Sequence, residues 1–119
     1  MRFRLGDKAR LNQILDAISE VEHYTLHSDF ETFSGNSMMR FACIKQLEII
    51  GEASDYFSEE IKMLFSDMEW RKINGMRNVF VNEHFEIDSK LIWEMIKYDL
   101  PDLKRKVIDI GNAIPISLG

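Results

Sequence analysis

The segment from Ser37 to Phe57 constrains the fold most, because its apolar residues follow helical spacing and cover much of the helix circumference. A helix with this pattern packs against neighbours on two sides. Gly51 lies inside the segment, where glycine is costly unless another backbone comes close. The apolar positions are Met39, Phe41, Ile44, Leu47, Ile50 and Ala53.

Helical periodicity and capping residues predict two helices around this segment. Asp7 is the predicted N-cap of a first helix. Ser58 is the predicted cap of a short helix from Glu59 to Phe65. The stretch between Ser28 and Ser37 is predicted as a loop, with Gly35 and Asn36 as turn residues. The apolar stripe of the first helix is Leu11, Ile14, Leu15, Ile18 and Val21.

Two more helices are predicted in the second half of the chain. One runs from about Glu69 into the motif that contains Arg77, and Asp88 is the predicted cap of the last helix. Pro101 is expected to kink this last helix or to start a new turn after Asp99. Its stripe is Ile92, Ile96, Leu100, Leu103, Val107 and Ile110. The sequence therefore predicts an all-α, up-and-down bundle of about five helices, in one domain over residues 1–119.

Charge and cysteine content narrow the function. The formal net charge of -5 argues against a dedicated, nonspecific nucleic-acid binder, although a local basic pocket in a dimer is compatible with it. The single cysteine, Cys43, lies in an apolar run and is predicted to be a buried thiol. No signal peptide or bilayer-spanning apolar run is found, so a cytoplasmic protein is expected.

Several short sequences occur in an order and spacing that resemble the HepT-like branch of the HEPN (higher eukaryotes and prokaryotes nucleotide-binding) proteins. The resemblance covers nearly the whole chain. It rests on Ile49-Ile50-Gly51-Glu52-Ala53, Trp70-Arg71-Lys72-Ile73, Met76-Arg77-Asn78, Phe85-Glu86-Ile87-Asp88, and Trp93 ahead of Asp99-Leu100-Pro101-Asp102-Leu103.

This resemblance implies a homodimeric helical bundle that acts as a metal-independent endoribonuclease, without a cofactor. It also implies the role of a toxin whose partner is a nucleotidyltransferase-type antitoxin. The family pattern is arginine, a polar residue, three more residues, histidine, any residue and tyrosine. Arg77 and Asn78 match its first half, whereas Asn82 stands in the histidine position and His84 in the tyrosine position. The family's tyrosine is the residue that accepts AMP.

The chemistry of RNA cleavage shows why these changes matter. Arginine is always charged and can bind phosphate oxygens in pairs, so Arg77 suits stabilisation of a phosphorane. Histidine can accept a proton from the 2′-hydroxyl, but the amide of Asn82 can only orient a phosphate or hydroxyl. Loss of a general base typically costs roughly 10²–10⁴ in rate. The substitution therefore predicts an attenuated or silenced nuclease.

The asparagine at position 82 is open to two further interpretations. Arg77 and His84 are seven residues apart, so on an α-helix they differ by only ~20° in direction and lie about 10 Å apart along the axis. His84 could then replace the missing base, particularly across a dimer cleft. Alternatively, residue 82 was changed deliberately to silence a toxin.

Other polar residues carry weaker predictions. His23 and His27 lie one turn apart, but without a third ligand they are interpreted as surface residues, and no metal site is predicted. Glu52 could pair with Arg77 or face solvent. Lys104-Arg105-Lys106 is predicted to be a helix surface that could also help to steer RNA.

Two functions of different classes follow. The first is a HepT-like toxin that cleaves RNA by 2′-hydroxyl attack, with Arg77, Asn78, Asn82 and His84 as the candidate catalytic residues. The second is a non-catalytic HEPN module that binds a nucleotidyltransferase or a nucleotide. An RNA-cleavage assay in the presence of EDTA distinguishes the two functions, because only the first of them includes cleavage.

Overall fold

A computed structural model describes residues 5–78 and 88–114. Within them the chain is helical, with no strand. Its elements are α1 (Leu5–Tyr24), α2 (Phe30–Gly35), α3 (Ser37–Asp55), α4 (Glu59–Leu64), α5 (Trp70–Asn74), a 3-10 turn (Gly75–Asn78), α6 (Ser89–Glu94), a π-helical turn (Met95–Asp99) and α7 (Leu100–Ala113). The predicted all-α bundle is confirmed.

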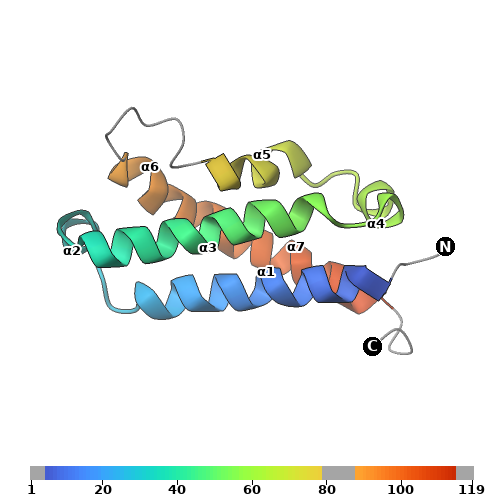
Figure 1. Ribbon diagram of the computed structural model, residues 1–119, viewed down its shortest axis with the longest axis horizontal. Coiled ribbons are helices and arrows are strands. Elements are labelled where there is room, and N and C mark those ends of the chain that lie inside the picture. The colour runs from blue at the N-terminus through green and yellow to red at the C-terminus, as the bar shows by residue number, and fades with distance from the viewer. Residues whose placement is uncertain (1–4, 79–87, 115–119) are drawn as a thin grey trace.

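Helix α3 lies in the middle of the bundle, as its apolar circumference predicts (Figure 1). It packs against α1 on one side and against α5 and the 3-10 turn on the other, while α7 packs on α1. The predicted stripes of the first and last helices are buried, except that Leu15 is partly exposed. Burial of apolar surface in water is the main force that holds such a bundle together.

The predicted loop between Ser28 and Ser37 is wrong, because it contains the short helix α2. Asp29 caps α2 by accepting a hydrogen bond from the Thr32 backbone N–H. Asn36 then ends α2 and caps α3, with its side chain accepting from the Met39 N–H. The polar residues that suggested a loop are thus the caps of two consecutive helices.

The short helix α2 carries an aromatic cluster that closes one end of the bundle. Phe33 is fully buried, and its ring lies 5.1 Å from that of Trp93 near the end of α6. The ring of Phe30 lies 6.4 Å from the same tryptophan. Side-chain packing therefore joins α2 to α6 at the N-terminal end of α3.

Asp7 is not the N-cap of the first helix, because α1 already includes Leu5. Its carboxylate is buried and accepts hydrogen bonds from the Ser58 backbone N–H at 2.7 Å and the Ser58 hydroxyl at 2.6 Å. Ser58 in turn caps α4 by accepting from the Ile61 N–H, as predicted. Asp7 thus fixes the start of α4 against the first turn of α1.

The last helical region contains the interruption that Pro101 predicted. The Leu100 N–H donates to the Met95 carbonyl, five residues back, which makes a single π-helical turn ahead of α7. Proline near a helix start loses no internal hydrogen bond, so α7 continues from this point.

Cys43 is buried, as predicted, and burial raises the pKa of its thiol to about 11. No helix in residues 5–78 and 88–114 is long and apolar enough to cross a membrane.

Candidate functional site

The candidate site begins with a close approach of two backbones. A Cβ atom added to Gly51 of α3 would lie 2.5 Å from the Arg77 backbone nitrogen and 3.0 Å from the Asn74 carbonyl oxygen. The first distance is shorter than real Cβ contacts allow and the second is tighter than most of them, so only glycine lets the 3-10 turn lie this close to α3. The expectation that another backbone approaches Gly51 is confirmed.

The 3-10 turn also decides which side chains face α3. The helix predicted from Glu69 into the motif ends sooner: α5 stops at Asn74, and Gly75–Asn78 follows as a 3-10 turn. Side chains three residues apart lie on one face both in the last turn of an α-helix and in a 3-10 turn. Ile73 and Met76 are accordingly both buried, while Asn74 and Arg77 both lie near the C-terminal end of α3.

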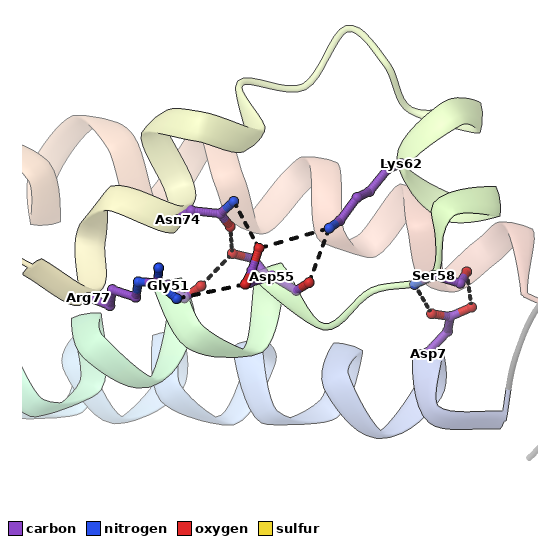
Figure 2. Close-up of polar contacts among 8 residues, drawn as sticks. Asp7, Gly51, Asp55, Ser58, Lys62, Asn74 and Arg77 are labelled. Atoms are coloured by element: carbon purple, nitrogen blue, oxygen red, sulfur yellow. Dashed lines mark hydrogen bonds and ion pairs between the residues drawn. The ribbon is translucent and has the colours of Figure 1, made fainter.

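These two side chains meet the carboxylate of Asp55, the last residue of α3 (Figure 2). The Arg77 Nη1 lies 3.7 Å from Asp55 Oδ2, and the Asn74 Nδ2 lies 3.4 Å from Asp55 Oδ1. Lys62 of α4 brings its Nζ to 4.0 Å from the same Oδ1. A carboxylate therefore lies among three donors that come from three different elements.

Hydrogen bonds to neighbouring groups hold two of these donors, Asn74 and Lys62, in place. The Ser54 hydroxyl lies 2.7 Å from the Asn74 Oδ1 and 2.8 Å from the Gly51 carbonyl oxygen, so it donates its single proton to one of them at a time. Lys62 Nζ donates to the Asp55 backbone carbonyl at 3.1 Å. Both contacts are made without the Asp55 carboxylate.

Helix α5, which leads into the 3-10 turn, is also held from its other side. Lys72 Nζ lies 3.2 Å from the Asp99 Oδ1 in the π-helical turn. This hydrogen bond and the charge of Asp99 raise the pKa of Lys72, with a further contribution from Glu69. A surface ion pair thus joins α5 to the π-helical turn, while the backbone contact with Gly51 positions Arg77.

The guanidinium of Arg77 is suited to bind an anion. Its side chain is 47% exposed, so it is fixed at its base and open to solvent at its tip. An arginine stays charged at any physiological pH and can give two parallel hydrogen bonds to phosphate oxygens.

Of the four candidate catalytic residues, the structure describes Arg77 and Asn78. Arg77 lies at the surface, and Asn78 is the last residue of the 3-10 turn. Asn82 and His84 lie outside the described residues. Arg77 itself lies in the 3-10 turn, and its predicted relation to His84 also falls outside the described residues.

Of the two possibilities for Glu52, pairing with Arg77 is wrong. Glu52 is exposed and lines a hollow of about 200 Å³ with Arg10 and Tyr56, on the side of α3 toward α1. Sequence reasoning missed Asp55, Lys62 and Asn74. A signal existed for Asp55, because it follows Gly51 by four residues and so lies on the same helix face.

The remaining polar predictions concern the surface. His23 and His27 are exposed, as predicted, and residues 5–78 and 88–114 contain no cluster of three or more metal-binding side chains. Lys104, Arg105 and Lys106 lie on α7, where they pair with Glu22 and Asp102. The hydrogen bond from Lys106 and the charges of Lys106 and Arg105 lower the pKa of Asp102.

Comparison with known proteins identifies the family. A model of the Ribonuclease HepT-like family matches residues 14–110. This chain belongs to that family. The prediction from the short motifs, the HepT-like branch of the HEPN superfamily, is therefore confirmed.

Curated relatives of this HepT-like chain have names of the same kind. A Methanocaldococcus jannaschii protein named "Putative RNase MJ1380" is 38% identical over 100 residues, 84% of this chain and 92% of the relative. A Thermococcus cleftensis protein named "Probable ribonuclease HepT" is 36% identical over 99 residues, 83% of this chain and 90% of the relative. No solved structure matches the chain. The family and these relatives support a function of the ribonuclease type.

Proposed function

We propose that this protein is the toxin of a toxin–antitoxin pair, a metal-independent endoribonuclease that cleaves RNA by attack of a 2′-hydroxyl on the adjacent phosphate. The observation that carries the proposal is the placement of Arg77, whose backbone is seated against Gly51 and whose guanidinium is half exposed. A cation fixed in this way can stabilise the developing charge of a phosphorane without reorganising.

The other candidate residues act around Arg77 in this proposal. Asn78 positions the phosphate, and Asn82 or His84 contacts the 2′-hydroxyl. Asn82 cannot remove a proton, so cleavage is attenuated or silent unless His84 acts as the base. His84 also lacks the phenolic oxygen that would carry AMP in the family's tyrosine position.

The proposed assembly is a homodimer, in which Arg77 of each protomer lies near a shared cleft, and the proposed partner is a nucleotidyltransferase-type antitoxin. Sedimentation equilibrium tests the dimer, with a monomer at micromolar concentration as the contrary result. Co-purification with a nucleotidyltransferase encoded beside this chain tests the partner.

Cleavage of labelled RNA in the presence of EDTA tests the activity. The parent protein is compared with Arg77→Ala, His84→Ala and Asn82→His. We expect Asn82→His to cleave RNA at least about a hundredfold faster than the parent, because it restores a titratable group at the family's position. Cleavage by the parent that disappears in His84→Ala would instead assign the base to His84.

One observation favours a second function. Asparagine in the histidine position is the change expected of a non-catalytic HEPN module that binds a nucleotidyltransferase or nucleotide. If neither the parent nor any variant cleaves RNA, the nuclease proposal is wrong and this function takes its place.

A further inference from the structure

Figure 2 shows the three donors, Arg77, Asn74 and Lys62, around the Asp55 carboxylate. The donors and the carboxylate differ in how firmly they are held. Arg77 is fixed through its backbone at Gly51, and Asn74 through the Ser54 hydroxyl. Lys62, only 22% exposed, is fixed by its 3.1 Å hydrogen bond to the Asp55 carbonyl oxygen. None of these three contacts uses the Asp55 carboxylate, so the donors would keep their places if it turned away.

The carboxylate itself is loosely bound. Its distances to the three donors are 3.4, 3.7 and 4.0 Å. Charge-assisted hydrogen bonds usually measure about 2.7–2.9 Å. The side chain is also 46% exposed, and ion pairs this open to water are weak. A ligand that binds the donors more strongly can therefore displace Asp55.

The chemistry of the donors suits a different anion. A phosphodiester has the same single negative charge as a carboxylate and, like it, presents two oxygens that can accept hydrogen bonds, its non-bridging oxygens. It is larger, so it can reach donors that Asp55 approaches only at 3.4–4.0 Å. Two cations and an amide N–H from separate elements form a suitable set for one phosphate of a nucleic-acid backbone.

We propose that Arg77, Lys62 and Asn74 form a binding subsite for an RNA backbone phosphate, and that the Asp55 carboxylate occupies this subsite in the free protein as a built-in competitor. This inference rests on the proposed function, since it assigns the phosphate to the same arginine. The inference adds Lys62 and Asn74 to the residues that bind RNA, and it gives Asp55 a regulatory role. RNA must displace Asp55, which weakens binding and disfavours strands that reach only Arg77.

The first test measures affinity for a single-stranded 2′-O-methyl oligoribonucleotide, which cannot be cleaved, by fluorescence anisotropy. Asp55→Asn should bind about threefold to tenfold more tightly than the parent, because the competing charge is gone. Glu52→Gln is the matched control: it removes one charge from the same helix, away from Arg77, and should change affinity less than about twofold. Equal or weaker binding by Asp55→Asn would overturn the proposal and make Asp55 a residue that orients Arg77.

The second test concerns Lys62. Lys62→Gln should weaken binding about threefold to tenfold and reduce the slope of log affinity against log salt by about 0.7, the loss of one phosphate contact to a single strand. Lys45→Gln, at an exposed position of α3, is the control and should leave the slope unchanged. An unchanged slope in Lys62→Gln would remove Lys62 from the subsite. Thermal unfolding of each variant verifies that it is folded.

Arg77→Ala separates failure of this inference from failure of the proposed function. If Arg77→Ala weakens RNA binding while Asp55→Asn does not tighten it, the competitor is rejected and Arg77 keeps its role. If Arg77→Ala binds RNA as the parent does, or the parent binds none, the proposed function fails together with the subsite.

Discussion

The two ends of α3 are held by different physics. At its N-terminal end, side chains provide the contacts: Asn36 caps the helix, and Phe33 packs on Trp93. At its C-terminal end, two backbones touch at Gly51, and a few polar side chains surround the contact. Volume-conserving substitutions are tolerated in a packed side-chain cluster, whereas the backbone contact leaves no room for one added methyl group. The end of α3 with the backbone contact is the one that positions Arg77.

The largest effect is expected at the aromatic end. Phe33→Ala removes a fully buried ring and should lower the free energy of unfolding by about 3–5 kcal/mol. Urea unfolding followed by circular dichroism measures the change. RNA affinity of the protein that stays folded should be close to that of the parent, because Phe33 and the 3-10 turn lie at opposite ends of α3. A large loss of affinity would contradict the separation of the two ends.

A single methyl group should have the second-largest effect. Gly51→Ala places a Cβ against the Arg77 backbone nitrogen, which should cost about 1–3 kcal/mol of stability and also weaken RNA binding. Gly6→Ala is the matched control: it lies in α1 with nothing within 4 Å of its added Cβ, and it should be neutral or stabilising by up to about 1 kcal/mol. Equal stability of the two variants would show that the close contact is not rigid.

Two polar substitutions, one at each end of α3, should lower the free energy of unfolding by similar amounts and so test the difference between the ends. Ser54→Ala removes the hydroxyl shared by Gly51 and Asn74, at about 0.5–1.5 kcal/mol. Asn36→Ala removes the cap of α3, at about 0.5–2 kcal/mol. Only Ser54→Ala should reduce RNA affinity, since it releases Asn74. Similar losses of affinity in both would mean that overall stability, not local position, governs binding.

The last prediction needs no substitution and concerns the reactivity of the Cys43 thiol, which can serve as a reporter. Its thiol pKa of about 11 keeps it protonated at pH 8, so Ellman's reagent should react at least about a hundredfold more slowly than with a free thiol of pKa near ~8.5. Reactivity should increase as the pH rises toward about 11. Because the raised pKa disfavours the thiolate in the folded state, the folded state is destabilised as the pH rises from about 8.5 toward 11.

The same reagent compares the two ends directly. Phe33→Ala should make Cys43 more reactive at pH 8, because it opens the end of α3 that carries this cysteine. Gly51→Ala should leave the reactivity unchanged, and an increase there would show that the disturbance spreads along the whole helix.

Sequence predicted the parts of the fold that apolar spacing controls. The stripes of α1 and α7 and the central position of α3 follow from burial of one or two helix faces. Gly51 predicted a close backbone because a glycine inside a long helix needs a compensating contact. Such inferences use residues within one element and their common environment.

The missed features depend on contacts between elements. Helix α2 is too short for periodicity to be seen, although its caps, Asp29 and Asn36, were visible. The Asp7 carboxylate accepts hydrogen bonds from Ser58, which is 51 residues away in the sequence. Arg77 lies near Asp55 and not Glu52. The spacing of Asp55 from Gly51 was visible in the sequence, but no local pattern predicted that the helix would end at Asn74 and continue as a 3-10 turn.

The π-helical turn at Met95–Asp99 has a consequence for evolution. Its hydrogen bond spans five residues instead of four, so the turn holds one residue more than an α-helical turn. Removing one residue there would restore an α-helix and rotate α6 by about 100° relative to α7. Ile92 and Trp93 would then leave the faces that they now occupy. Length at this point should therefore be under stronger selection than residue identity, and relatives of different length here should carry a reorganised aromatic cluster.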